Sequence, residues 1–294
     1  MAKIGVFDSG YGGLTILDAI RRELPQYDYL YLGDNARAPY GTHSFDVIYR
    51  YTLEAVQYLL SQDCALVILA CNTASAKALR TIQQRDLPEI NRQLSTNRSI
   101  VNRPIVNVLG VIRPTVEAVP GITKTGHVGI LATPATVSSE SYVLELLKVQ
   151  SDNVQCTKEM VVTQQACPMW VPLIEAGEHE KPGADYFVEK YLQEILDKDP
   201  QIDTLVLGCT HYPLLKAKLS RQLSAISHQP IQIIAQGDLV ANSLKDYLQR
   251  HPEYREQLSQ GGSCTYLTTE NADRFSQSAS LFIGSPVQAE HIAL

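Results

Sequence analysis

The chain has 294 residues, enough for two α/β domains or one large one. Its hydrophobic content of 45% and charged content of 19% are those of an ordinary globular protein. The net charge of −6 argues against a general nucleic-acid binder, which presents a basic face. No apolar run approaches the roughly 20 residues that span a bilayer. We find neither a signal peptide nor a C-x-x-C pair among the six cysteines, and we expect a cytoplasmic protein with reduced thiols.

Segments of strand length alternate with amphipathic segments of helix length along the chain. The predicted strands cover residues 4–7, 29–32, 65–70, 105–109, 127–131, 154–162, 204–208, 231–234 and 265–268. The clearest predicted helices cover residues 14–24, 45–62, 134–147 and 184–198. This alternation indicates βαβ units and mainly parallel sheets, and nine strands fit two sheets better than one.

Two segments interrupt this pattern. Residues 83–103 are polar and carry no clear strand, so we predict a helix end followed by a linker or surface insertion at a domain boundary. Residues 178–184 are predicted to form an exposed turn.

The first predicted strand is followed by Asp8, Ser9 and a glycine-rich turn into a helix. A carboxylate and a hydroxyl there would suit a ligand, although helix capping is also an ordinary role for them. The run GYGG lacks the third glycine of the dinucleotide fingerprint, so nucleotide binding is a weak interpretation. After the second strand, Tyr40 offers a phenol and Gly41 an unobstructed amide, unless this loop is only a Pro-Gly turn with a half-buried tyrosine.

Two later strands end in nearly the same way, as ALVILACNTAS with Cys71 and TLVLGCTHYPL with Cys209. A thiol at the carboxyl end of a buried parallel strand lies where open α/β sheets build their sites. Most strand cysteines are structural, but these two precede polar residues and a predicted helix start, whose positive end should lower the thiol pKa. Two thiols that converge on one ligand point to proton transfer on both faces of one carbon. The repeat also indicates two similar halves.

Polar neighbours of both cysteines extend the candidate site. Asn72 and Thr73 follow the first cysteine, and Thr210 and His211 follow the second. His211 could assist proton transfer, hold a thiolate, or be an ordinary structural histidine. Zinc ligation by the two cysteines and His211 would lack a fourth ligand, so we expect no metal.

Thr133 and Thr136 lie at another strand-to-helix junction. Their hydroxyls could bind a carboxylate or simply cap the helix, and the sequence alone leaves both roles open. The remaining cysteines are expected to be structural or incidental, and they are Cys64, Cys156, Cys167 and Cys264.

Taken together, these motifs resemble those of the glutamate racemase family, within the aspartate/glutamate racemase superfamily. The resemblance rests on FDSGYGGLTIL, YLGDNARAPYG, ACNTAS, VGILATPATV, ACPMWVPLIEAG, GCTHYPLL and TTENADRFSQSASLF. It implies a cofactor-independent racemase with two α/β domains and the site between them. It also implies glutamate as a small-molecule substrate, a homodimer that binds neither nucleic acid nor membrane, and the supply of D-glutamate for bacterial peptidoglycan.

The resemblance gives the acid/base roles to the two cysteines, with Cys71 deprotonating D-glutamate and Cys209 deprotonating L-glutamate. Asp8 near Cys71 and His211 near Cys209 would orient the protons. The residues that it implies for the glutamate site are Asp8, Ser9, Tyr40, Gly41, Asn72, Thr73, Thr210 and His211.

We assign residues 1–103 and 213–294 to a first domain and residues 104–212 to a second. The first would carry Asp8, Tyr40 and Cys71, and the second would carry Thr133, Cys209 and His211.

Two alternatives compete with the glutamate assignment. Aspartate racemases of the superfamily usually carry other residues at the positions of Ser75 and His211, which disfavours that substrate. A non-catalytic ligand-binding protein of the same fold is disfavoured by the presence of both cysteines. The chain also departs from the family at Ala235 and Gln236, where Asp-Ser or Asp-Pro is common.

Overall fold

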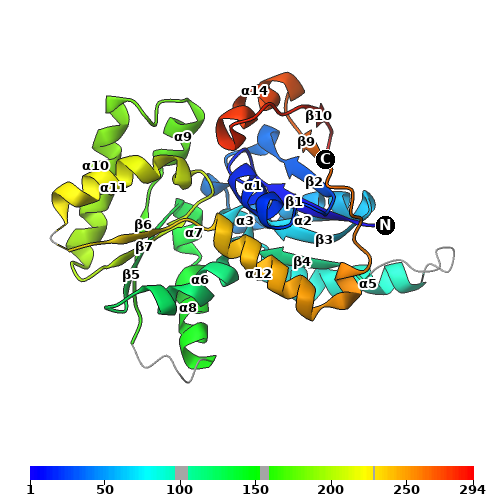
Figure 1. Ribbon diagram of the computed structural model, residues 1–294, viewed down its shortest axis with the longest axis horizontal. Helices are drawn as coiled ribbons and strands as arrows, with labels where there is room; N and C mark the ends of the chain where they lie inside the picture. The colour runs from blue at the N-terminus through cyan, green and yellow to red at the C-terminus, as the bar shows by residue number, and fades with distance from the viewer. Residues whose placement is uncertain (97–104, 153–158, 228) are drawn as a thin grey trace.

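The structure is a computed structural model that describes residues 1–96, 105–152, 159–227 and 229–294 (Figure 1). Within these residues, ten strands form two parallel sheets, which confirms the predicted fold class. The first sheet has the order β10-β9-β2-β1-β3-β4, with β1 at Lys3–Asp8, β2 at Tyr29–Gly33, β3 at Cys64–Leu69, β4 at Asn107–Gly110, β9 at Cys264–Thr268 and β10 at Ala289–His291. The second has the order β6-β5-β7-β8, with β5 at His127–Ala132, β6 at Val161–Ala166, β7 at Thr204–Gly208 and β8 at Gln232–Ile234.

Helices cover both faces of each sheet (Figure 1). The first sheet packs on one face against α1 (Leu14–Glu23), α12 (Gly237–Arg250) and α14 (Ala272–Ile283), and on the other against α2 (Phe45–Ser61), α3 (Asn72–Lys77) and α5 (Leu87–Thr96). The second packs against α9 (Trp170–Glu175), α10 (Pro182–Lys198) and α11 (Lys216–Ile226) on one face and against α6 (Ile112–Ile122) and α8 (Ser141–Asp152) on the other. Shorter pieces are α4 (Leu79–Thr81), α7 (Pro134–Ser138), α13 (Pro252–Arg255), a π-turn η3 (Ile82–Asp86) and the 3-10 helices η1 (Asn35–Arg37), η2 (Tyr40–Thr42) and η4 (Tyr212–Leu215).

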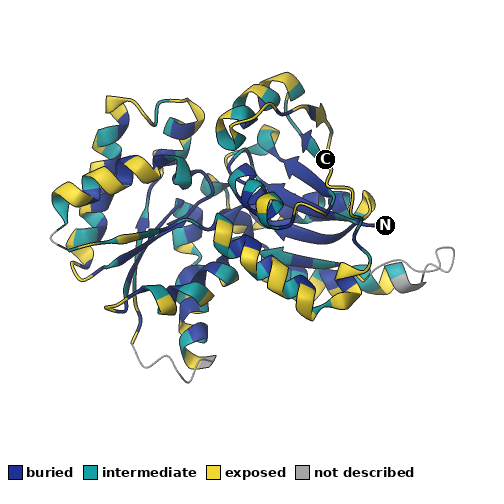
Figure 2. Cartoon of the chain, in the orientation of Figure 1, coloured by how far each residue is buried: buried dark blue, intermediate teal, exposed yellow. Residues whose placement is uncertain are grey.

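Strand β3 explains why the central strands are almost wholly apolar. Leu66 and Ile68 pack into the cluster under α1 and α12, whereas Val67 and Leu69 pack into the cluster under α2 and α3. Successive side chains of a strand point to opposite faces, so a sheet covered on both faces needs apolar residues at every position. Figure 2 shows these strands as the buried centre of each half.

Two predicted elements differ from the structure. Strand β6 begins at Val161, so the strand predicted at 154–162 is wrong in position, and residues 153–158 lie outside the described residues. The helix predicted over 134–147 is two helices, because Glu140 adopts a left-handed φ of 56° between α7 and α8. Strand β10 was not predicted, and its residues are too few to show a period.

The segment predicted as a helix end and linker at 83–103 is helical as far as it is described. The π-turn η3 and helix α5 carry it to Thr96, and Ile90 and Leu94 pack against the core of the first half. This helix is hard to recognise in the sequence, because the two apolar residues on its inner face are four positions apart and are surrounded by polar residues. Residues 97–104 lie outside the described residues. The turn predicted at 178–184 ends where α10 begins, at Pro182.

Sheet membership differs from the predicted domain bounds at two strands. Strand β4, on the second-domain side of the bound at 103, pairs with β3 of the first sheet. Strand β8, on the first-domain side of the bound at 212, pairs with β7 of the second sheet. By sheet pairing, the chain therefore crosses between the halves after β4 and again after β8.

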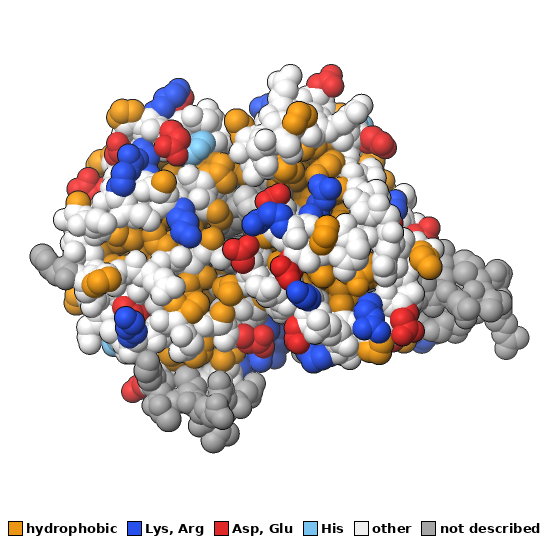
Figure 3. Space-filling model, viewed as in Figure 1, with side chains coloured by type: hydrophobic (Ala, Val, Ile, Leu, Met, Phe, Trp, Pro, Cys, Tyr) orange, Lys and Arg blue, Asp and Glu red, His pale blue; other side chains and the backbone are white. Residues whose placement is uncertain are grey.

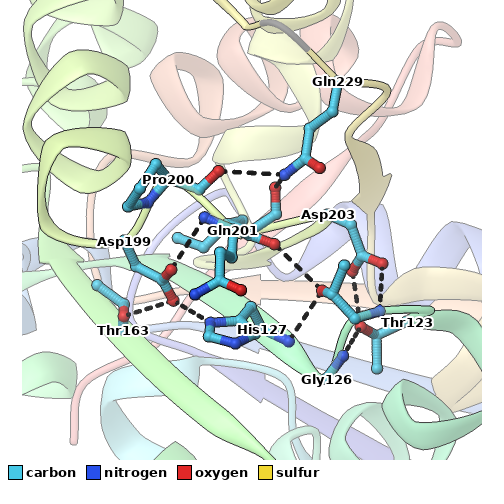
Figure 4. Close-up of polar contacts among 11 residues, drawn as sticks. Thr123, Gly126, His127, Thr163, Asp199, Pro200, Gln201, Asp203 and Gln229 are labelled. Carbon is cyan, nitrogen blue, oxygen red and sulfur yellow. Dashed lines mark hydrogen bonds and ion pairs between the residues drawn. The ribbon is translucent and has the colours of Figure 1, made fainter.

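Hydrogen bonds of polar side chains connect the loops at the amino ends of β5 and β7 (Figure 4). Asp203 accepts hydrogen bonds from Thr123 Oγ1 at 2.6 Å and from the backbone N–H groups of Lys124 and Thr125 at 2.7 and 2.8 Å. Burial raises the pKa of Asp203, but these hydrogen bonds outweigh it and hold the pKa below its ordinary value. This end of the sheet is therefore held by local hydrogen bonds.

The surface drawn in Figure 3 shows cationic and anionic side chains interspersed over one face of the molecule. Among the described residues, none of the helices combines the length and the apolar character needed to cross a membrane.

Candidate active site

The carboxyl ends of the two sheets face one another across a small cavity of about 90 Å³. Every predicted site residue except Asp8 lines it. The lining comprises Ser9, Gly10, residues 38–42, residues 71–73, Thr133, Pro134, Cys167, Pro168, Val171, Pro172, Glu175 and residues 209–211. The structure thus brings both cysteines to one space from separate halves of the chain.

Cys71 occupies the N-cap position of α3, directly after the buried strand β3. Its sulfur accepts a hydrogen bond from the Ala74 N–H at 3.4 Å and lies 3.3 Å from Ser9 Oγ. Burial and the neighbouring carboxylate of Asp8 nevertheless raise the pKa of Cys71 to about 12, because these two donors oppose them only in part. The helix start does lower this thiol's pKa through the Ala74 N–H, as expected, but the net shift is upward because burial and Asp8 outweigh it.

Cys209 has different partners, although it follows β7 in the same way. Its sulfur lies 3.9 Å from His211 Nδ1, and His211 Nε2 lies 2.9 Å from Glu175 Oε1. Burial lowers the pKa of His211, but Cys209 and Glu175 outweigh it and raise the pKa to about 10. His211 is therefore an imidazolium at neutral pH and places a positive charge between the sulfur and the carboxylate.

Asp8 lies just behind the cavity wall and is 1% exposed. It accepts a hydrogen bond from the Gly10 N–H at 2.9 Å, and Thr210 Oγ1 of the other half lies 3.5 Å from its second oxygen. Burial raises its pKa, against the opposing charge of His211. Helix α1 begins at Leu14 with Gly13 as its N-cap residue, and a backbone hydrogen bond from Gly13 also lowers the pKa of Asp8, so this carboxyl contacts the start of the helix as well.

The halves meet closely beside these residues. A Cβ atom on Gly12 of the first half would overlap both Thr210 Oγ1 and His211 Nδ1 of the second. Only glycine leaves room for this approach.

Three threonine hydroxyls gather beside the cavity, which Thr73 and Thr133 line. Thr73 Oγ1 lies 2.9 Å from Thr133 Oγ1, and both lie within 3.3 Å of Thr136 Oγ1. Thr133 also caps α7, so this one residue both caps a helix and lines the cavity. Such a cluster can offer several O–H donors to an anionic group.

Tyr40 and Gly41 line the cavity in different ways. The Tyr40 hydroxyl donates its proton to Asp34, which also accepts a hydrogen bond from Arg37 Nε at 2.6 Å. This phenol therefore has no second proton to donate to a ligand. Burial, with the charge of Asp34, raises the pKa of Tyr40 well above its ordinary value. Gly41 lies against Thr133, where an added Cβ would come within 3.0 Å of the threonine Cβ.

Glu175 was not among the predicted site residues. It ends α9, whose Trp170 is fully buried and packs edge-on against Tyr212 with ring centroids 4.8 Å apart. This packing aims the end of α9 at the cavity. Glu175 lies within the family-like motif ACPMWVPLIEAG, and its local signal is a lone acidic residue at the end of the otherwise apolar run WVPLIE. Among the described residues, no group of three or more His, Cys, Asp or Glu side chains is arranged to hold a metal ion.

Residues 12–244 match a family model described as Asp/Glu/Hydantoin racemase. The glutamate racemase of Ruegeria sp. (strain TM1040) is 39% identical over 297 residues, which cover 98% of each chain. That of Paracoccus denitrificans is 37% identical with the same coverage. Among solved structures, glutamate racemase isoform RacE1 from Bacillus anthracis gives a TM-score of 0.82 at 28% identity, covering 100% of this chain and 98% of that one. Full-length similarity at this level, with a family model over most of the sequence, leads to one conclusion: the chain belongs to the Asp/Glu/Hydantoin racemase family.

Proposed function

We propose that the protein interconverts L-glutamate and D-glutamate with two thiols and so supplies D-glutamate for peptidoglycan synthesis. The observation that carries this proposal is that Cys71 and Cys209 line one cavity from separate halves of the chain. Relatives of full length carry the name glutamate racemase, and a solved structure from Francisella tularensis, with a TM-score of 0.78, is a complex with D-glutamate.

Racemisation removes the Cα proton from one face and returns a proton to the other. One cysteine as thiolate takes the proton from Cα, and the other as thiol donates its own proton to the opposite face. The pair ends with its protonation states exchanged, so the reverse reaction can start at once. Since substrate and product are mirror images, the equilibrium constant is one, and two like groups suit work in both directions.

The surroundings of the two sulfurs differ. Cys71 holds its proton, because burial and Asp8 raise its pKa to about 12. Cys209 has the imidazolium of His211 beside it, with 3.9 Å between its sulfur and His211 Nδ1. We assign Cys209 as the base toward L-glutamate and Cys71 as the base toward D-glutamate.

Negative charge that develops on the substrate needs fixed donors in a dry site. Thr73, Thr133 and Asn72 line the cavity, and we assign their hydroxyl and amide groups to this purpose. We place the substrate carboxylate at the threonine cluster, where O–H donors and the capped start of α7 converge. The proposal requires no cofactor, and dialysis against EDTA should leave the rate unchanged.

A chiral assay tests the function directly. The purified protein should convert L-glutamate and D-glutamate to the same equal mixture and should incorporate deuterium at Cα in D₂O. Aspartate at the same concentration is the control for the rival substrate and should react far more slowly. Absence of turnover on glutamate, with binding retained, would support a ligand-binding protein instead.

Three further properties belong to the proposal. We assign the protein to the cytoplasm and expect a homodimer, which sedimentation equilibrium measures directly. We also propose two domains, with crossings after β4 and after β8 as sheet pairing indicates. Limited proteolysis that cuts near these crossings would support the division.

A further inference from the structure

A closed ring of hydrogen bonds lies behind the cavity, beside Cys71. Asn72 Nδ2 donates to Gln236 Oε1 at 2.6 Å, Gln236 Nε2 donates to the Tyr142 hydroxyl at 2.9 Å, and that hydroxyl donates to Asn72 Oδ1 at 2.7 Å. Each of the three side chains is at most 2% exposed. Buried polar groups that satisfy one another in this way hold a single arrangement.

The direction of the ring is set by a backbone group outside it. Gln236 Nε2 also lies 3.2 Å from the Val111 carbonyl oxygen, which can only accept. Thr115 Oγ1 donates to that same carbonyl at 2.8 Å and so receives Gln236 Nε2 as an acceptor, also at 2.8 Å. The nitrogen of Gln236 must therefore face Val111, and its oxygen must face Asn72. The orientation of the Asn72 amide follows from this, with its nitrogen toward Gln236 and its oxygen toward Tyr142.

The ring also joins the two halves of the molecule where the chain crosses between them. Gln236 lies at the start of α12, directly after β8, and Val111 lies at the start of α6, directly after β4. Tyr142 comes from α8 of the second half, and Asn72 from α3 of the first. One side chain, Gln236, thus bonds to both crossings and to a residue of the cavity wall.

We propose that Gln236 is a positioning residue of the reaction, acting through Asn72. Asn72 has two N–H groups, one of which is used by Gln236, and no other described residue accepts from the second. The ring holds this second N–H in one orientation, and Asn72 lines the cavity directly after Cys71 in the chain. Gln236 does not contact the substrate. Because it holds the Asn72 amide in position beforehand, no free energy is needed to orient that amide during the reaction. This inference rests on the proposed racemisation.

Two variants open the ring at different points. Gln236→Met keeps the approximate shape and removes the amide, and Tyr142→Phe removes only the hydroxyl. Each should lower kcat/KM for glutamate by about tenfold to hundredfold, mainly through kcat, because a misplaced donor weakens transition-state stabilisation more than binding. Tyr247→Phe is the matched control, since the Tyr247 hydroxyl also accepts from an asparagine, Asn107 Nδ2 at 2.8 Å, away from the cavity. It should react like the wild type.

A double-mutant cycle separates positioning from structural support. If Gln236 acts through Asn72, Gln236→Met should cost nothing further in an Asn72→Ala background. The same loss in both backgrounds would overturn the proposal, as would wild-type rates in folded Gln236→Met and Tyr142→Phe. If Gln236→Met fails to fold, Tyr142→Phe is put through the same cycle with the same expectations.

A measurement without turnover keeps this inference apart from the proposed function. The side-chain amide protons of Asn72, assigned by their loss in Asn72→Ala, should exchange slowly with solvent in the wild type and faster in Gln236→Met. Unchanged exchange in Gln236→Met would overturn the proposal whether or not glutamate is racemised. A wild type that fails to racemise glutamate would overturn the proposed function, while the amide exchange would still decide whether the ring orients Asn72.

Discussion

The surroundings of Cys71 and Cys209 differ far more than their positions do. Both follow a buried parallel strand, and both line the same cavity. Around Cys71 lie two neutral donors and a carboxylate, which together with burial leave the thiol protonated. Beside Cys209 lies an imidazolium held by Glu175. Strand geometry places the two sulfurs alike, whereas side chains from other elements make them chemically unequal.

Replacing either cysteine by serine should have the largest effect. We expect racemisation to fall by about 10² to 10⁴-fold in Cys71→Ser and in Cys209→Ser, because a hydroxyl is a far weaker base at neutral pH. Deuterium exchange distinguishes the faces. Cys209→Ser should still exchange Cα of D-glutamate but not of L-glutamate, and Cys71→Ser should do the reverse. Circular dichroism and Tm control for folding, and wild-type racemisation in both variants would refute the two-thiol mechanism.

Glu175→Gln should weaken only the side of the site that holds Cys209. A hydrogen bond to a charged group contributes roughly 1.5 to 3 kcal/mol, which corresponds to about a tenfold to hundredfold loss of kcat/KM. The exchange of L-glutamate should fall more than that of D-glutamate, because Cys209 is the assigned base toward L-glutamate. Equal losses in both exchange rates would show that Glu175 supports the whole site rather than one sulfur.

The same variant predicts a pH-dependent stability difference. The pKa of His211 is raised from 6.5 to about 10 on folding, so its ion pair contributes full stability below pH 6.5 and loses it as the pH rises toward 10. Urea unfolding should therefore give a difference between wild type and Glu175→Gln that is largest near pH 6 and shrinks through the alkaline range. A difference that grew with pH would contradict a protonated His211.

Asp8→Asn should change the other side of the site by a smaller amount. The Asp8 carboxylate raises the pKa of Cys71, so its removal should move the rising limb of the pH profile for D-glutamate to lower pH. In the profile for L-glutamate, Cys71 starts as the thiol, so there the falling limb should move to lower pH instead. A limb that stayed in place would mean that Asp8 does not control the Cys71 proton.

Asp203→Ala should have the smallest effect on activity, because Asp203 lies at the amino end of β7 (Figure 4), whereas Cys71 and Cys209 follow the carboxyl ends of β3 and β7. Losing its hydrogen bonds should lower the free energy of unfolding by about 1 to 2 kcal/mol and leave kcat/KM unchanged. The pKa of this carboxyl is lowered by folding, so the stability difference should disappear as the pH falls below 3.8. A loss of activity without loss of stability would link this end of the sheet to the site.

The sequence predicted the parts of the site that follow strands. Cys71 and Cys209 could be found because a parallel sheet brings the carboxyl ends of its strands to one edge, where an abrupt change from apolar to polar residues is visible. The same reasoning located Ser9, Asn72 and Thr210. The helix start alone did not predict the net pKa shift of Cys71, because the larger effects of burial and Asp8 are properties of the folded surroundings.

The rest of the site depends on packing between distant elements. Glu175 reaches His211 only because Trp170 anchors α9 against the second half, and no local pattern records that contact. Gln236 and Tyr142 meet Asn72 through the two chain crossings, which the predicted bounds at 103 and 212 did not locate. Contacts of this kind follow from tertiary arrangement rather than from periodicity.

Because Gly12 has no side chain, the two halves of the molecule can approach each other closely at this position. A single methyl group at this position would overlap both Thr210 and His211 and push the two halves apart. Cys71 and Cys209 are only 5% and 7% exposed, and we expect this close approach of the halves to limit the access of water to both sulfurs. Gly12→Ala should therefore separate the two halves at the site, expose both thiols to solvent and raise their alkylation rate. Unchanged alkylation in a folded Gly12→Ala protein would mean that solvent reaches the sulfurs by another route.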